Sequence, residues 1–200
     1  MGFGLLLMGY FLSFLMSNIH SAFAFAGAYL MIIALLKLRA YRREFAYTLY
    51  PAGLFMALSL KDTVLDLLSM FGGEVAFFES AVVSTVSELL MIAAVSLFHL
   101  FLFLSIGGLA KEIGLEKIRV SAMRNLVFFA VYVILCAVRF LPIKYPDVFA
   151  LYLNLIIMLM QLFWIFLTLL LLFSCFRNIA DKEKQDRELA EETDDSMKGE

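Results

Sequence analysis

The sequence predicts an all-α integral membrane protein, in which a bundle of six transmembrane helices is joined by short loops. Three features favour this fold class: the composition, the spacing of the apolar segments and the placement of the basic residues. The chain has 200 residues, of which 63% are hydrophobic, whereas a soluble domain is nearer half apolar. A soluble fold of this length has too small a core to hide so many apolar side chains. The chain is therefore expected to sit in lipid.

The apolar segments set the number of helices. A bilayer core of about 30 Å needs roughly 20 apolar residues in a helix. Charged and polar breaks divide the chain into six such segments, which we predict as helices over 2–18, 22–38, 45–65, 80–110, 125–141 and 148–176. The break at 17–21 is uncharged, so a five-span alternative that fuses the first two segments stays open. That alternative would place the N-terminus outside.

The basic residues set the orientation. Six spans bring nine of them to one side of the membrane, namely Lys37, Arg39, Arg42, Arg43, Lys111, Lys117, Arg119, Arg124 and Arg177. Within residues 1–177 the opposite side keeps only Lys61, Arg139 and Lys144. Because cytoplasmic loops carry the excess of Lys and Arg, we expect both termini in the cytoplasm. The expected location is a cell membrane, the bacterial inner membrane in particular.

Two segments are candidates for contact with other proteins. The charged segment 178–200 follows the bundle of residues 1–177, and its composition predicts a cytoplasmic tail that is disordered or forms a loose helix at its start. It could simply keep that face solvated, or dock a cytoplasmic partner. Small residues crowd the segment 22–28, which predicts close packing against a neighbouring helix. Contact with another membrane protein is the alternative there. The lipid bilayer is the main expected partner, and the basic loops suit anionic lipid headgroups rather than nucleic acid.

The segment 59–69, SLKDTVLDLLS, interrupts the third apolar region with charges. Ser59, Asp62, Asp66 and Ser69 are spaced so that they share one helical face. Counting about 1.5 Å per residue from Phe45 brings Asp62 to the outer membrane boundary. The segment is therefore either an interfacial helix with its carboxylates in water, or a polar stripe that faces an outer vestibule.

The fourth apolar region offers a matching stripe that includes Ser84 and Glu88. Glu88 falls below the outer headgroups, where an ionisable group usually needs a partner inside the bundle. Arg139 lies at a similar depth, so we predict a Glu88–Arg139 ion pair. The expected binding residues of the outer vestibule are Ser59, Asp62, Asp66, Ser84, Glu88 and Arg139.

His99 lies deeper, between Leu and Phe residues. A lone histidine there is either a neutral packing residue or a member of a proton relay. The sequence contains no HExxH, P-loop, dinucleotide fingerprint or GxSxG motif. We therefore predict no catalytic residues, no metal site and no cofactor.

The function class that these patterns favour is transport or binding of a small molecule or ion through the outer vestibule. The alternative is a non-catalytic accessory or assembly subunit of a membrane complex. A membrane-embedded enzyme, with Glu88, Asp62 or His99 as acid or base, stands third. We expect that the protein is not an enzyme, because no nucleophile–base or metal constellation is visible.

Overall fold

The computed structural model describes residues 2–71, 81–139 and 146–198, and within these ranges it contains helices and no strand. The elements are α1 (Gly2–Phe14), a short 3-10 turn η1 (Met16–Asn18), α2 (Ser21–Leu38), α3 (Phe45–Met70), α4 (Ala81–Glu112), α5 (Glu116–Arg139) and α6 (Asp147–Lys198). The predicted all-α class and the number of helices are confirmed.

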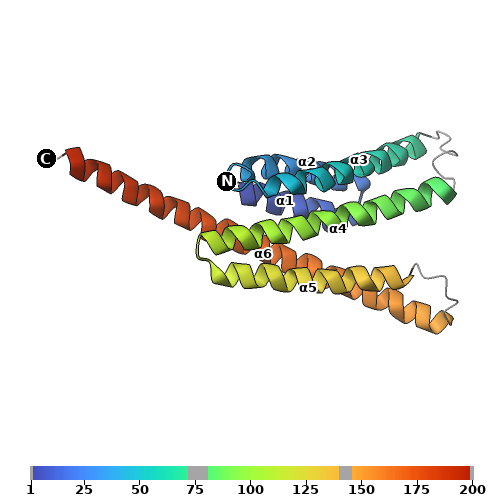
Figure 1. Cartoon of the computed structure of the whole chain (residues 1–200). Helices are drawn as coiled ribbons and strands as arrows, with labels where there is room; N and C mark the ends of the chain where they lie inside the picture. Colours follow the sequence, from blue (N-terminus) through green and yellow to red (C-terminus); the bar gives the residue numbers. More distant parts are fainter. Residues whose placement is uncertain (1, 72–80, 140–145, 199–200) are drawn as a thin grey trace.

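The six helices form a closed ring. Each helix packs against the next one in the chain, and α6 returns to pack against α1. The N-terminus and the α4–α5 turn lie at one end of the bundle, and the start of α4 lies at the other (Figure 1). α4 ends at Glu112 because Gly114 adopts a left-handed φ of 73°, which lets the Leu115 N–H bond to the Ala110 carbonyl.

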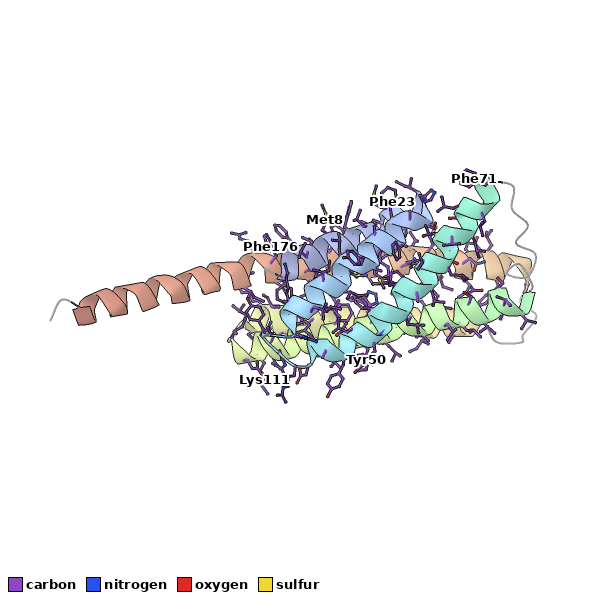
Figure 2. The ribbon with its side chains drawn as sticks, turned by 90° about the horizontal axis from the view of Figure 1, so that it is seen from above. Met8, Phe23, Tyr50, Phe71, Lys111 and Phe176 are labelled. Carbon is purple, nitrogen blue, oxygen red and sulfur yellow. The ribbon has the colours of Figure 1, made fainter. Side chains whose placement is uncertain are left out.

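Four helical segments are long and apolar enough to cross a membrane: Ser21–Leu38, Val82–Glu112, Glu116–Val138 and Leu151–Ile179. The first helix, with its 3-10 turn, is apolar but shorter. α3 has 26 residues and carries Lys61, Asp62 and Asp66 near its end. Apolar side chains cover the outside of the bundle, as Met8, Phe23 and Phe176 show in Figure 2. Such a surface is costly in water and suits contact with lipid.

Several helix boundaries differ from the predicted ones: α1 ends at Phe14 and not at residue 18, and α3 continues to Met70 and not to residue 65. The two largest differences are at the start of α5 and the end of α6. α5 begins at Glu116, where the sequence predicted residue 125, because the basic stretch is itself helical and Arg119 pairs with Glu116 in its first turn. α6 continues as a helix to Lys198, whereas a tail that is disordered or loosely helical at its start was expected from residue 178. This stretch has no Gly or Pro before Gly199 and is rich in Glu and Lys, which favour helices. The extension projects beyond the bundle (Figure 1).

The tightest helix contact joins α1 to α2. A Cβ atom on Gly27 would lie 2.4 Å from the Ser13 Oγ and 2.5 Å from the Gly9 carbonyl oxygen. Only hydrogen fits at this position, so the two backbones touch. Ala28 is fully buried beside it. The prediction that the small residues of 22–28 pack against a neighbouring helix is confirmed, and α1 is that neighbour.

At the opposite end from the start of α4, one arginine ties the α2–α3 connection to α4. Arg42 donates two hydrogen bonds to the Glu44 carboxylate, and its Nη1 lies 2.8 Å from the Glu112 carboxylate. The guanidinium lies directly on Gly108, where a Cβ atom would come within 2.5 Å of it. The missing side chain of Gly108 therefore makes room for this ion pair.

Candidate functional site

The middle of the ring is filled by aromatic side chains around His99, which is fully buried on α4. The closest ring belongs to Trp164 of α6, with centroids 4.4 Å apart and an edge-to-face arrangement. The other rings against His99 come from α4 itself, α5 and the first helix: Tyr10, Phe14, Phe98, Phe103 and Phe129. The six helices therefore enclose a packed aromatic cluster at this level and not an open channel.

Two hydrogen bonds hold the His99 ring. Its Nδ1 lies 2.7 Å from the Val95 carbonyl, and its Nε2 lies 2.9 Å from the Tyr10 hydroxyl. A carbonyl can only accept, so Nδ1 carries the hydrogen and Nε2 accepts the Tyr10 O–H. This pairing satisfies a neutral imidazole completely. The geometry favours the packing alternative for His99, in which the residue links α1 to α4.

Thr168 of α6 extends this polar contact to a third helix. Its side chain is buried, lies within hydrogen-bonding reach of Tyr10, and donates from Oγ1 to the Trp164 carbonyl at 2.8 Å. The Tyr10 hydroxyl therefore stands where α1, α4 and α6 meet.

A pocket of about 200 Å³ lies beside the aromatic cluster, between α4, α5 and α6. Its wall is mostly apolar and aromatic and is made by Phe14, Met91, Ile92, Val95, Ser96, Phe129, Tyr132, Val133, Cys136, Gln161 and Trp164. Phe14, Phe129 and Trp164 belong to both the pocket and the cluster. The cluster thus closes one side of the pocket.

Trp164 lines the pocket, but its indole N–H is enclosed by packed side chains. The Trp164 side chain is 2% exposed, and its Nε1 is buried and makes no hydrogen bond among the described residues. A buried N–H left unpaired costs about 1–3 kcal/mol. No charged side chain lines the pocket among the described residues, and its polar side chains are Ser96, Tyr132, Cys136 and Gln161. The wall is therefore neutral and mostly apolar.

The outer ends of α3 and α4 are joined by Lys61. Its Nζ donates to the Ser87 Oγ of α4 and lies 2.9 Å from the Asp62 carboxylate. α2 has 18 residues, and counting the same number along antiparallel α3 reaches Asp62. Lys61 and Asp62 are therefore level with the turn before α2, where His20 caps the helix by accepting the Ala22 N–H. Their place at the outer edge of a membrane stays a prediction.

The remaining residues of the predicted vestibule do not form a cluster in the described part of the structure. Ser59 is buried and its hydroxyl has no partner. Asp66, Ser84 and Glu88 are exposed, and no ion pair of Glu88 is found among the described side chains. Arg139 ends α5, but its side chain lies outside the described residues. The Glu88–Arg139 pair stays a prediction.

Glu88 nevertheless stands close to the pocket along α4. It precedes Met91 and Ile92, which line the pocket, by three and four residues. These spacings place Glu88 one helical turn beyond the wall on the same side of the helix. The predicted outer site and the observed pocket therefore share α4 but differ in depth and in polarity.

Sequence reasoning missed several polar residues that join the helices. Tyr10 lies in an uncharged apolar segment without a pattern that marks it. Asn125 was expected at a helix start, whereas its side chain is buried and donates to the Leu167 carbonyl at 2.9 Å, joining α5 to α6. Trp164 did carry a signal, because it lies in the middle of a long apolar segment, away from the membrane interfaces where Trp is usually found.

The described residues contain no group of three or more His, Cys, Asp or Glu side chains that could hold a metal ion. No protein family model, curated protein or solved structure matches this chain. The candidate site therefore rests on the geometry of the pocket between α4, α5 and α6.

Proposed function

We propose that this chain is a membrane protein that binds a small molecule in the pocket between α4, α5 and α6. This keeps the function class expected from the sequence, transport or binding, and moves its site from the polar outer edge to the pocket. The observation that carries the proposal is the pocket of about 200 Å³ itself, whose wall is mostly apolar and aromatic and holds no charged side chain among the described residues.

The shape of the bundle supports the proposal. Binding sites in helical proteins commonly lie between helices, and they combine an apolar wall with a few polar atoms that orient the ligand. The pocket has this composition, with Ser96 and Gln161 as further polar side chains on the wall. The Tyr10–His99 hydrogen bond and the rings packed on Trp164 hold one side of the pocket in place.

The fluorescence of Trp164 tests the proposal, because this is the chain's single tryptophan. A compound that enters the pocket should shift or quench the emission and raise the melting temperature of the purified protein. Val133→Phe would fill the pocket from α5 and should abolish both effects. Val131→Phe is the matched control, since Val131 lies on the same helix, is 42% exposed and does not line the pocket.

Two results would count against binding at this site. One is that no compound in a broad apolar and aromatic library changes the emission of the wild-type protein. The other is that Val133→Phe and Val131→Phe respond alike to a compound that does. Either outcome would favour the accessory-subunit alternative, for which the projecting end of α6 is the natural contact surface (Figure 1).

We further propose that all six helices cross the membrane, with both termini in the cytoplasm of a bacterium. The basic residues support this, because Arg42 and Lys111 lie at the same end of the bundle as the N-terminus (Figures 1 and 2). Single cysteines at two exposed positions, Asn18→Cys and Lys117→Cys, test the topology in a background without Cys136 and Cys175. A membrane-impermeant maleimide should label position 18 and spare position 117 in intact cells. The reverse pattern would overturn the proposed orientation.

A further inference from the structure

We infer that the pocket takes a small amphipathic cation, whose apolar part lies inside the pocket and whose ammonium group lies beside the Glu88 carboxylate. This inference rests on the proposed function and narrows it to a ligand class. Amines that carry one ring or a short apolar chain have this chemistry. Three features lead to it: the neutral interior of the pocket, the carboxylate one helical turn beyond its wall, and the acidic segments around that end of the bundle.

The interior of the pocket accepts an apolar group of about one ring. A volume of about 200 Å³ is slightly larger than an engineered cavity of about 150 Å³ that binds benzene. Ser96 and Gln161 are on the wall among aromatic and aliphatic side chains, and none of the described residues that line it is charged. Burying an unpaired charge in such surroundings is costly. A charged group of the ligand therefore has to stay at the edge of the pocket.

Glu88 lies at that edge. It precedes Met91, Ile92 and Val95 of the wall by three, four and seven residues, which places it on the same side of α4. The distance along the helix to the nearest of them is about one turn, roughly 5 Å, toward the start of α4. Glu88 is exposed, and no ion pair among the described side chains includes it. Its carboxylate would therefore meet an ammonium group that keeps contact with water while the apolar part of the ligand enters the pocket.

The side of α6 that lines the pocket carries uncharged acceptors. α4 and α6 begin at the same end of the bundle (Figure 1). Gln161 lines the pocket and is exposed, and Asn154 lies seven residues before it, two turns nearer to that end on the same face of α6. An ammonium group has three N–H donors, and both carboxylate and amide oxygens accept them. The ligand therefore finds acceptors on two helices at the edge of the pocket.

The charges around this end of the bundle also favour a cation. The segments 59–88 and 139–147 hold six acidic residues and three basic ones. They are Asp62, Asp66, Glu74, Glu79, Glu88 and Asp147 against Lys61, Arg139 and Lys144. A surface with an excess of one sign of charge concentrates ligands of the opposite sign. An amine is therefore attracted toward the pocket, and a carboxylate of the same size is repelled.

Three fluorinated probes of one ring each test the charge of the ligand. para-Fluorophenethylamine is a cation at neutral pH, para-fluorophenethyl alcohol is a neutral molecule of similar shape, and para-fluorophenylacetate is an anion. Their affinities are measured by fluorine NMR with the full-length protein in nanodiscs of zwitterionic lipid. For each probe, the signal from the Val133→Phe variant is subtracted as partition into lipid. The amine should bind more tightly than the acetate to the wild-type protein, and high salt should reduce this difference.

Glu88→Gln locates the charge preference at one carboxylate. This variant should bind the amine about two- to fivefold more weakly, because an ion pair in contact with water is weak, and should bind the alcohol as the wild type does. The retained binding of the alcohol also shows that the variant is folded. Asp66→Asn is the matched control, since Asp66 is an exposed carboxylate on α3 that does not line the pocket. It should change the affinity of the amine by less than Glu88→Gln does.

The outcomes separate this inference from the proposed function. An affinity of the amine that is unchanged in Glu88→Gln, or that falls equally in Asp66→Asn, would overturn the role of Glu88 and leave the pocket as a binding site. So would an effect of Glu88 that is seen only after Arg139→Gln, because the predicted Glu88–Arg139 pair would then occupy the carboxylate. Tighter binding of the acetate than of the amine would overturn the cationic ligand class. Binding of all three probes no greater than in Val133→Phe would overturn the proposed site itself.

Discussion

The α1–α2 hairpin and the α4–α5–α6 sector are packed in opposite ways. In the hairpin, Gly9 and Gly27 bring two helix backbones into direct contact and leave no room for a methyl group. In the sector, the large side chains of Phe129, Tyr132 and Trp164 hold three helices apart and leave a pocket of about 200 Å³. Both regions are apolar, so hydrophobicity alone does not distinguish them.

The difference shows where a binding site can arise in an apolar bundle. Small residues let helices approach until the backbones fill the space between them. Large rings have fixed shapes and leave gaps wherever three of them meet without a fourth side chain to fill the space. The gap here keeps a few uncharged polar side chains on its wall, among them Ser96 and Gln161.

The largest loss of stability is expected when a methyl group is added where α1 and α2 touch. Gly27→Ala should destabilise the protein by about 2–3 kcal/mol, because the new Cβ atom would overlap the backbone oxygen of Gly9 and the backbone nitrogen of Ser13. Gly53→Ala is the matched control. Gly53 is also inside a helix, but a Cβ atom there meets nothing within 4 Å.

Thermal melts of the two variants in detergent measure this contrast. Gly53→Ala should be neutral or up to about 1 kcal/mol more stable, since alanine favours the helix over glycine. Equal melting temperatures for the two variants would show that the hairpin is not tightly packed, and the comparison between the two regions would fail.

A moderate loss of stability is expected when the hydrogen bond between Tyr10 of the hairpin and His99 of α4 is removed. Tyr10→Phe removes the donor to His99 Nε2 and should cost about 1–3 kcal/mol, because the imidazole nitrogen is left buried and unpaired. Tyr50→Phe is the control, since Tyr50 is 79% exposed. The measurement is urea or thermal unfolding of both variants.

A double variant sharpens this prediction. His99→Leu alone leaves the Tyr10 hydroxyl without its acceptor, whereas Tyr10→Phe combined with His99→Leu removes both partners. The double variant should be more stable than the sum of the single effects implies, by about 1 kcal/mol. Strict additivity would show that the Tyr10–His99 hydrogen bond does not couple the hairpin to α4.

The smallest expected effect lies at the end of the bundle that carries Arg42. Hydrogen bonds from Arg42 lower the pKa of Glu44 below its ordinary value. The pair therefore stabilises the folded state above the ordinary pKa, and this contribution is lost as the pH falls through the lowered one. Because the Glu44 side chain is 47% exposed, the effect should stay below about 1 kcal/mol.

Melting temperatures of the wild type and of Glu44→Gln measure this effect between pH 7 and pH 3. The wild type should be slightly more stable near neutral pH, and the difference should shrink as the pH falls below the ordinary pKa of a glutamate and through the lowered pKa of Glu44. A difference that persists unchanged at pH 3 would show that the ionised Glu44 is not what stabilises the α2–α3 connection.

The residues that the sequence identified correctly are those whose position follows from counting along one helix. Lys61 and Asp62 are such a case, because a helix advances by a constant rise from the basic end of α3 and brings both residues level with the turn before α2. Their depth in a membrane stays a prediction. The close packing at Gly27 is another, since a run of small residues can serve only helix contact in lipid. The charge of residues 178–200 left disorder or a loose helix at its start as the expectation, whereas α6 continues to Lys198, because Glu and Lys also favour helices.

The candidate site could not be predicted by counting residues along one helix. Tyr10 and His99 are 89 residues apart, and no local pattern pairs them. The pocket depends on which faces of α4, α5 and α6 turn toward each other, and apolar residues surround each of these helices. A helix that is apolar all round does not reveal its buried face.

The sequence by itself determined that this protein is helical, that it is apolar enough for a membrane, and which ends of its helices carry the basic residues. Each of these properties follows from the composition of a segment or from the spacing of its apolar and basic residues, so neighbouring residues are enough to predict it. The tertiary structure alone decided that His99 is enclosed and hydrogen-bonded to Tyr10, that Gly9 faces Gly27, and that the buried N–H of Trp164 is unpaired among the described residues. Each of these depends on the rotation of one helix against another, which packing between distant residues sets.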